Sequence, residues 1–210
     1  MAKILSPAYL FDPIAADYEN MREEIAWSPF PHVAAAFCDW SMQNKRVLDL
    51  GCGTGEVTRF LQSQGAKAVG VDISAEMCFV AAERSENIQF LPHDISQPMP
   101  FADASFDAVI ALGCMEYLKE PADVLADIAR MLSPRGRLLA VFERRGADCP
   151  GGDAASVLFF DHWMRYRCNE KELETLLKPH FSHYRLERVL GYILEESNET
   201  IQYIRVIADK

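Results

Sequence analysis

The chain has 210 residues, 50% of them apolar and 25% charged, a composition typical of a globular protein with its own core. Acidic residues outnumber basic ones by 31 to 21, and the net charge of −10 disfavours nucleic acid as a partner, because phosphate binding needs a basic surface. We expect neither a secretory signal nor membrane insertion, since no apolar run approaches the roughly 20 residues that cross a bilayer.

The cysteines and histidines give no sign of a metal site or of disulfide bonds. The six cysteines form no CxxC pair, and no two histidines have the spacing of metal ligands. Reduced cysteines behave as small apolar residues and are normal in proteins of the cytoplasm. We therefore predict a cytoplasmic protein without a bound metal.

Strand and helix signals alternate from residue 45 to residue 143, after a first segment (1–44) that predicts a cap of one or two helices. Ser74 and Pro121 are typical first residues of helices. Short β-branched runs predict strands at 46–50, 68–72, 88–91, 106–112 and 138–142. Strands separated by helices of about ten residues are joined by right-handed crossovers, so we predict an α/β fold with a doubly wound, mostly parallel sheet.

The last third of the chain is organised differently. Glycine and proline predict a loop at 144–153, and a helical pattern covers 171–177. Two strands, 184–190 and 202–208, are predicted to form an antiparallel edge hairpin through a turn at 195–199. We expect a single domain over 1–210, made of a cap (1–44), a core (45–143) and a C-terminal region (144–210).

Three glycines at alternate positions, Gly51, Gly53 and Gly55, follow the first predicted strand. They let a ligand approach the backbone N–H groups at the start of a helix, and Asp72 ends the next strand, where an acid binds ribose hydroxyls. A dinucleotide site would have its third glycine one residue later, where this chain has Glu56, whose charge opposes a pyrophosphate. The loop therefore favours a nucleoside without phosphates.

Longer stretches occur in an order typical of one enzyme family. They are 47–55 (VLDLGCGTG), 70–74 (GVDIS), 93–95 (HDI), 101–107 (FADASFD), 116–118 with Pro121, and 132–138 (LSPRGRL). From residue 46 to residue 142 the chain thus resembles the class I S-adenosylmethionine-dependent methyltransferases. The resemblance implies a Rossmann-like fold whose mostly parallel sheet has seven strands, with an antiparallel C-terminal edge hairpin and an N-terminal helical lid.

The resemblance also implies S-adenosylmethionine as the cofactor and a set of residues that hold it. Asp49 and the glycine loop would hold the methionine part, Asp72 the ribose and Asp94 the adenine, while Tyr18 lies in a helix that closes over the cofactor in many relatives. The expected cofactor-binding residues are Tyr18, Asp49, Gly51, Cys52, Gly53, Thr54, Gly55, Asp72, Ile73, Met77, Asp94, Ile95, Leu112, Gly113 and Met115. The spacing of Ile73 and Met77 fits a place in the core equally well.

Catalytic residues are less well defined by the sequence. Tyr117 stands where the family commonly has a histidine, and Arg135 replaces a glycine in a turn. Glu116, Glu143 and His162 are candidates for acid–base work on an acceptor, although a structural or surface role is more common for such residues. Methyl transfer depends mainly on holding the nucleophile in line with the reacting carbon, so few catalytic side chains are needed.

We predict methyl transfer to an oxygen, nitrogen or carbon atom of a small molecule, by a monomer or a homodimer. The acceptor pocket is expected between the N-terminal helices and the segment after residue 142, with aromatic side chains that line it or pack in the core at Trp27, Phe30, Phe159, Phe160 and Trp163. Three alternatives stay open: a protein methyltransferase, a module that binds S-adenosylmethionine or S-adenosylhomocysteine without catalysis, and a nicotinamide oxidoreductase, which Glu56 disfavours.

Overall fold

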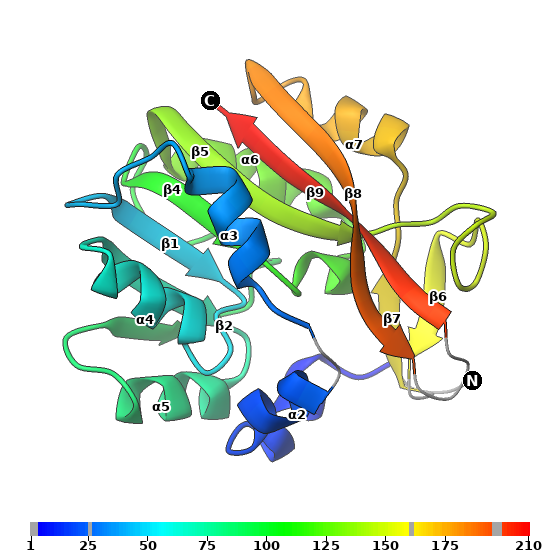
Figure 1. The fold of residues 1–210 in the computed structure, drawn as a ribbon, viewed down its shortest axis with the longest axis horizontal. Helices are drawn as coiled ribbons and strands as arrows, with labels where there is room; N and C mark the ends of the chain where they lie inside the picture. The colour runs from blue at the N-terminus through cyan, green and yellow to red at the C-terminus, as the bar shows by residue number, and fades with distance from the viewer. Residues whose placement is uncertain (1–3, 25–26, 160–161, 195–198) are drawn as a thin grey trace.

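A seven-stranded sheet forms the centre of the computed structural model, which describes residues 4–24, 27–159, 162–194 and 199–210 (Figure 1). Its strands are β1 (Arg46–Leu50), β2 (Lys67–Asp72), β3 (Gln89–Pro92), β4 (Phe106–Ala111), β5 (Leu132–Glu143), β8 (His183–Leu194) and β9 (Glu199–Asp209). Their order in the sheet is β3-β2-β1-β4-β5-β9-β8. The first five are parallel, whereas β9 is antiparallel to β5 and to β8. The predicted fold class, with its antiparallel edge hairpin, is confirmed.

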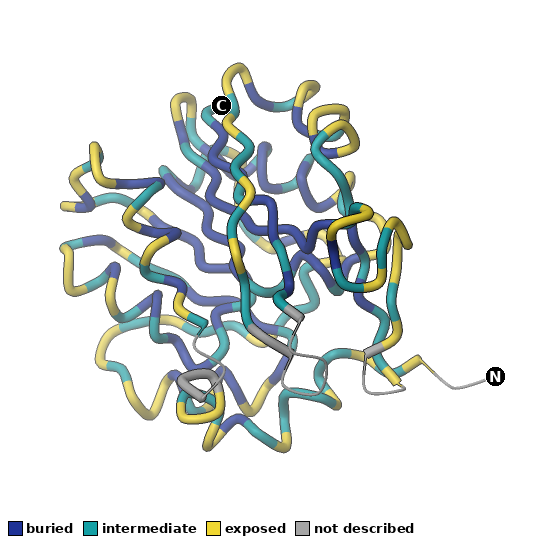
Figure 2. The backbone as a smooth tube through the Cα atoms, turned by 45° about the vertical axis from the view of Figure 1, so that its right-hand side comes forward, coloured by how far each residue is buried: buried dark blue, intermediate teal, exposed yellow. Residues whose placement is uncertain are grey.

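Helices cover both faces of the sheet (Figure 1). They include α3 (Phe30–Phe37), α4 (Glu56–Ser63), α5 (Ala75–Glu83), α6 (Pro121–Met131) and α7 (Glu170–Leu177). Side chains alternate between the faces of a strand, so Val47 packs with α3 and α4, while Leu48 and Leu50 pack with α6 and α7. The strands are consequently buried on both sides, as the dark tube at the centre of Figure 2 shows.

The N-terminal segment departs from the sequence prediction. Ahead of α3 come α1 (Ala8–Phe11), the 3₁₀ helix η1 (Asp12–Ile14) and α2 (Tyr18–Glu24). The prediction of one or two helices in this segment is therefore wrong. Prolines explain the division, because proline is accepted only in the first turn of a helix: Pro13 lies at the start of η1 and Pro29 directly precedes α3.

The entrance to β5 also differs from the predicted turn. Helix α6 ends at Met131 and β5 begins at the next residue, so the turn expected at Arg135 is instead a bulge within the strand. Arg135 has a φ of 68°, in the left-handed region that favours glycine. Arg135 thus has the backbone conformation that suits glycine, the residue that the resembling family has at this position.

A second, two-stranded sheet was not predicted. Strands β6 (Ser156–Phe159) and β7 (Trp163–Tyr166) pair in antiparallel fashion after the predicted loop. The short β7 carries Arg165 into the interior, where its side chain is 3% exposed. The predicted turn at 195–199 lies outside the described residues except for its last position, which begins β9.

Candidate functional site

A cavity of about 260 Å³ lies at the carboxyl ends of β1, β2 and β4. In open parallel sheets this edge is where ligands bind, because the loops that follow neighbouring strands meet there. The residues that line the cavity are Ser6, Pro7, Phe11, Tyr18, Gly51, Gly53, Asp72, Ile73, Met77, Asp94, Ile95, Ser96, Leu112, Gly113, Cys114, Tyr117 and Leu118.

A smaller cavity of about 50 Å³ adjoins it and shares Tyr18, Gly51, Gly53 and Leu112. Its remaining walls are Trp27, Pro29, Asp49, Cys52, Thr54, Glu56 and Val57. Acidic side chains line both cavities, and among the described residues that line them there is no lysine, arginine or histidine. The two together therefore suit a neutral or cationic ligand better than one with phosphates.

The glycine loop turns sharply between β1 and α4. Gly51, Gly53 and Gly55 have φ values of 67°, 52° and 80°, all in the region that glycine adopts without strain. A Cβ on Gly51 would lie 2.5 Å from that of Cys114, and one on Gly55 would lie 2.8 Å from the Phe90 ring. Gly55 lines neither cavity, so the structure assigns it to packing between the loop and β3.

Asp72 connects the end of β2 to the glycine loop. Its Oδ2 accepts the backbone N–H of Gly53 at 2.8 Å, and its Oδ1 accepts that of Ser74 at 2.9 Å. Burial raises the pKa of Asp72, and these backbone hydrogen bonds oppose the rise. The carboxylate thus fixes the loop and at the same time lies in the wall of the larger cavity.

Asp49, the last but one residue of β1, is 3% exposed and lies in the wall of the smaller cavity. Thr58 donates its hydroxyl to Oδ2 of Asp49 at 2.6 Å. Burial raises the pKa of Asp49 to about 7, against the hydrogen bond from Thr58 and together with the nearby charge of Asp72. A cation bound beside Asp49 would favour its charged form.

Residues 4–24, which we call the lid, close the cavity on the side away from the sheet. Ser6, Pro7, Phe11 and Tyr18 form this wall. The Phe11 ring meets the rings of Tyr18 and Tyr117 edge to face, with centroids 6.1 and 5.8 Å apart. The wall of the cavity therefore combines these aromatic rings with the carboxylates of Asp72 and Asp94.

The catalytic candidates lie outside this cavity. Glu116 and Glu143 are buried, at 4% and 3% exposure. Both pair with Arg165: its Nη2 lies 3.4 Å from Glu116 Oε1, and its Nε lies 2.8 Å from Glu143 Oε2. Tyr203 donates to Glu116 and accepts from Arg165 in the same cluster. His162 is exposed and its carbonyl accepts from the Leu5 amide. The placement favours structural roles for all three candidates.

Most of the expected cofactor-binding residues come together at one place. All except Gly55 and Met115 line one of the two cavities; Met115 is 2% exposed and belongs to the core. In the wall of the larger cavity the sequence prediction missed Phe11, Tyr117 and five other residues, which are Ser6, Pro7, Ser96, Cys114 and Leu118. Tyr117 lies within the motif at 116–118 and Cys114 lies two residues before it, so the motif was the available signal.

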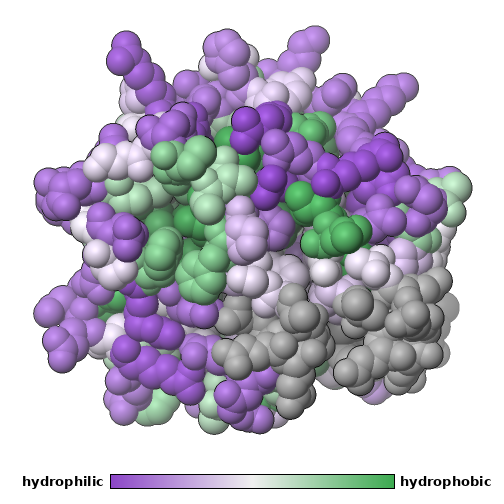
Figure 3. Space-filling view, viewed as in Figure 1, coloured by the Kyte–Doolittle hydropathy of each residue, from purple (hydrophilic) through white to green (hydrophobic). Residues whose placement is uncertain are grey.

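The expected aromatic wall is only partly present. Trp27 lines the smaller cavity, whereas Phe30 packs edge to face on Phe60 under an apolar patch over α3 and α4 that Figure 3 shows in green. Trp163 donates its Nε1–H to the carbonyl of Ser6 at 3.2 Å. The side chain of Phe159 and the whole of Phe160 lie outside the described residues.

Two further findings concern the described residues alone. They contain no cluster of three or more histidine, cysteine, aspartate or glutamate side chains that could hold a metal ion. Among them, too, no helix has the length and apolarity needed to cross a membrane.

Comparisons with known proteins show which proteins the chain is similar to. A family model for a methyltransferase domain matches residues 48–140. A demethylmenaquinone methyltransferase of Tropheryma whipplei is 32% identical over 133 residues, which is 62% of this chain and 56% of that protein. A ubiquinone biosynthesis O-methyltransferase of Xanthomonas oryzae is 26% identical over 136 residues, 63% of this chain and 50% of that one. The chain thus spans about half the length of these curated relatives.

The overall fold matches a solved structure over more of the chain. A SAM-dependent methyltransferase from Methanosarcina mazei superposes with a TM-score of 0.67 at 20% sequence identity, covering 86% of this chain and 97% of that one. The likeness in fold therefore extends beyond residues 48–140.

Proposed function

We propose that this chain, whose residues 48–140 match a family model for a methyltransferase domain, is a class I S-adenosylmethionine-dependent methyltransferase that transfers a methyl group from S-adenosylmethionine to a small molecule. The observation that carries the proposal is the pair of adjoining cavities, with a glycine loop and four carboxylates in their walls. The cofactor supplies a methyl group on a positively charged sulfur, which a nucleophile displaces.

The larger cavity fits the adenosine part of the cofactor. Asp72 would accept hydrogen bonds from ribose hydroxyls, and Asp94, whose Oδ1 also accepts the Ser96 amide at 2.9 Å, would bind the adenine amine. Ile73, Met77 and Ile95 line the same part and offer an apolar surface for the base. Met77 is also 1% exposed, so it serves the core as well.

The smaller cavity fits the amino-acid part. Asp49 and the backbone of the glycine loop, including Cys52 and Thr54, line it and would hold an ammonium and a carboxylate group. Glu56 lies in the same wall, at the first residue of α4. A pyrophosphate there would meet a negative charge, which argues against a nicotinamide dinucleotide.

The acceptor would enter beside Tyr117, Leu112, Gly113 and Leu118. A Cβ added at Gly113 would have no atom within 4 Å, so the backbone there leaves open space for a ligand. The surrounding Phe11, Tyr117 and Leu118 offer a largely apolar and aromatic surface. A wall of this kind supports a small and preferably aromatic acceptor.

Catalysis in this proposal rests on positioning. Bringing the acceptor atom to the methyl carbon in a site that excludes water contributes roughly 7–11 kcal/mol to lowering the barrier. Glu116 and Glu143 stay in their ion pairs with Arg165 and do not act as bases. The acceptor is therefore a group that is nucleophilic once oriented, such as an ionised phenol or an activated carbon.

Cellular setting and assembly belong to the same proposal. The six cysteines are all free, which supports a reducing compartment such as the cytoplasm. A monomer or a homodimer would be sufficient, since both cavities are walled by a single chain.

Calorimetric titration with S-adenosylhomocysteine tests cofactor binding, with NAD as the matched negative control. Saturable binding of the first ligand and none of the second is expected. Incubation with methyl-labelled S-adenosylmethionine and a metabolite extract should then yield a labelled small molecule. Binding without any labelled product across extracts would favour the non-catalytic module, and label in protein alone would favour a protein methyltransferase.

A further inference from the structure

The Glu19 carboxylate, in the first turn of α2, contacts three elements at once. Its Oε1 accepts the Thr54 hydroxyl at 2.6 Å, lies 3.1 Å from Nη2 of Arg59 and lies 2.9 Å from Nη1 of Arg84. Thr54 belongs to the glycine loop, Arg59 to α4, and Arg84 follows α5. One side chain of the lid thus joins the loop to the two helices that flank it.

The two arginines extend this contact to the backbone. Arg59 donates from Nη1 to the carbonyl of Thr54 at 2.6 Å, and Arg84 donates from Nη2 to the carbonyl of Ala16 in the lid at 3.2 Å. Each arginine therefore holds the Glu19 carboxylate and a main-chain oxygen at the same time. The cluster orders the backbone of the lid and of the glycine loop together.

A second polar contact joins the lid to the other end of the cavity. Ser74, the N-cap of α5, donates its hydroxyl to Asp12 of η1 at 2.5 Å. The Ser74 amide in turn donates to Asp72. The lid is thus tied to the glycine loop on one side and to Asp72 on the other.

Apolar packing holds the lid only weakly. Neither α1 nor η1 buries a residue, and Ala15 is the one described lid residue that is buried, at 2% exposure. Segments with few buried apolar contacts open at low free-energy cost. The polar contacts of Asp12 and Glu19 therefore account for much of what keeps the lid closed.

Tyr18 is the neighbour of Glu19 and lies across the glycine loop. A Cβ on Gly53 would be 3.6 Å from Cε1 of Tyr18, and both cavities have Tyr18 in their walls. Because the two residues are adjacent at the start of α2, the contacts of the Glu19 carboxylate hold the backbone from which the Tyr18 ring extends over the loop.

We infer that Glu19 is a positioning residue that holds Tyr18 over the glycine loop and thereby slows release of the bound cofactor or its product. This inference rests on the proposed function and adds that the lid's ionic contacts control the lifetime of the complex. The glycine loop and the lid bias each other, so a ligand that orders the loop also stabilises the closed lid.

The test compares Glu19→Gln with wild type in the full chain. Glutamine keeps an oxygen for the Thr54 hydroxyl but loses the charge that pairs with both arginines. S-adenosylhomocysteine should dissociate about three- to tenfold faster in stopped-flow displacement, while its association rate changes less than about twofold. The matched control is Asp17→Asn, an exposed lid acid with the same charge change, which should leave both rates unchanged.

Salt gives a second readout that a general loss of stability would not produce. Raising the salt concentration from about 0.05 to about 0.5 M screens partly exposed pairs, so it should speed dissociation from wild type and have little effect on Glu19→Gln. Arg84→Gln, outside both cavities, should shift the rates in the same direction and serves if the first variant does not fold.

The outcomes separate this inference from the proposed function. No binding of S-adenosylhomocysteine by wild type would overturn the proposed function. Binding by wild type with equal dissociation rates and equal salt dependence in Glu19→Gln would overturn the positioning role and leave the proposed function standing.

Discussion

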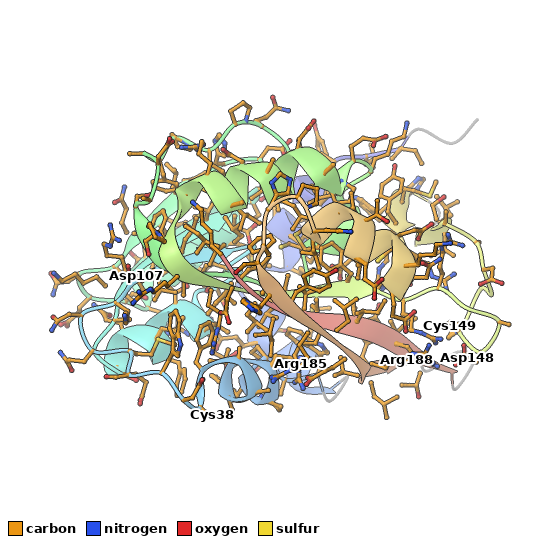
Figure 4. All side chains as sticks on the ribbon, turned by 90° about the horizontal axis from the view of Figure 1, so that it is seen from above. Cys38, Asp107, Asp148, Cys149, Arg185 and Arg188 are labelled. Carbon is orange, nitrogen blue, oxygen red and sulfur yellow. The ribbon has the colours of Figure 1, made fainter. Side chains whose placement is uncertain are left out.

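The Arg46 guanidinium donates two hydrogen bonds to the Asp107 carboxylate, from Nη2 to Oδ1 at 2.9 Å and from Nε to Oδ2 at 3.3 Å. The Arg46 amide also donates to Oδ2 at 3.0 Å, and Ser133 donates to Oδ1 at 3.1 Å. These bonds join the amino ends of β1 and β4, the sheet edge opposite the cavity. Figure 4 shows Asp107 near one end of the molecule, far from Asp148 and Cys149. The last acid of the motif at 101–107 therefore serves the fold.

Asp107→Asn should lower the free energy of unfolding at pH 7 by about 1–2 kcal/mol. The hydrogen bond from Arg46 lowers the pKa of Asp107 to about 2, so the carboxylate is stabilising above its ordinary pKa near 4, and that stability is lost as the pH falls through 2. Urea unfolding from pH 2 to pH 7 should show the two proteins converging in acid. Asp103→Asn, in the same motif but 80% exposed, should cost less than about 0.5 kcal/mol.

Asp72→Ala should weaken binding of S-adenosylhomocysteine about ten- to a hundredfold, because a hydrogen bond made by a charged group is lost. The same carboxylate holds Gly53, so the loop is also disturbed. A double-mutant cycle with a ligand that lacks the ribose hydroxyls separates the two effects. Wild type should bind this deoxy ligand more weakly than the full ligand. Asp72→Ala should bind the two ligands equally well. An equal loss from deoxygenation in both proteins would show that Asp72 does not bind the ribose.

Asp49 should make the stability of the ligand-free protein fall as the pH rises from about 4 to about 7. Burial raises its folded-state pKa to about 7, so the folded chain binds a proton more tightly than the unfolded chain in this window. The expected slope is on the order of 1.4 kcal/mol per pH unit. Asp49→Asn keeps an oxygen for the Thr58 hydroxyl. The stability of this variant should depend less on pH than that of wild type, and it should exceed that of wild type at pH 8.

Buried His32 gives the opposite slope, because burial lowers its pKa to about 4 and stability is lost on acidification below about 6.5. Its contribution is common to wild type and Asp49→Asn and cancels in their difference. Parallel stability curves for the two proteins between pH 4 and pH 8 would contradict an elevated pKa at Asp49.

Arg135→Gly should stabilise the protein by about 0.5–1 kcal/mol. Its φ of 68° costs a residue with a Cβ roughly 1–2 kcal/mol, and the greater freedom of glycine in the unfolded chain offsets part of the gain. Arg135→Ala keeps the Cβ and should bring no gain, which separates backbone strain from the loss of the exposed guanidinium. The midpoint of urea unfolding measures both variants, and a lower midpoint for Arg135→Gly would refute the argument.

The sequence predicted the sheet well and the flanking segments poorly, for a physical reason. β1 and β4 are buried on both faces, so their apolar runs are nearly continuous and easily recognised. The lid buries little and has no strong period, and its prolines divide it into pieces that composition alone does not delimit. β6 and β7 have four residues each, too few for an alternating pattern to stand out.

The candidate site, too, was predicted from the sequence only in part. The glycine loop follows β1 directly, and Asp49 and Asp72 lie at the carboxyl ends of β1 and β2, so their place at this edge of the sheet could be predicted from the order of elements. The pairing of Glu116 with Arg165 could not, because the partners are 49 residues apart and meet through a hairpin that the sequence did not predict. The approach of Phe11 to Tyr117 likewise depends on how the lid lies over the sheet.

The residues that line the larger cavity come from two parts of the chain. Most residues that line the larger cavity lie within the stretch that the family model matches, whereas Ser6, Pro7, Phe11 and Tyr18 precede it. Under the proposed function, substitutions at these four positions are expected to change which acceptor binds, while Asp49, Asp72 and the glycine loop keep their places at the ends of the strands.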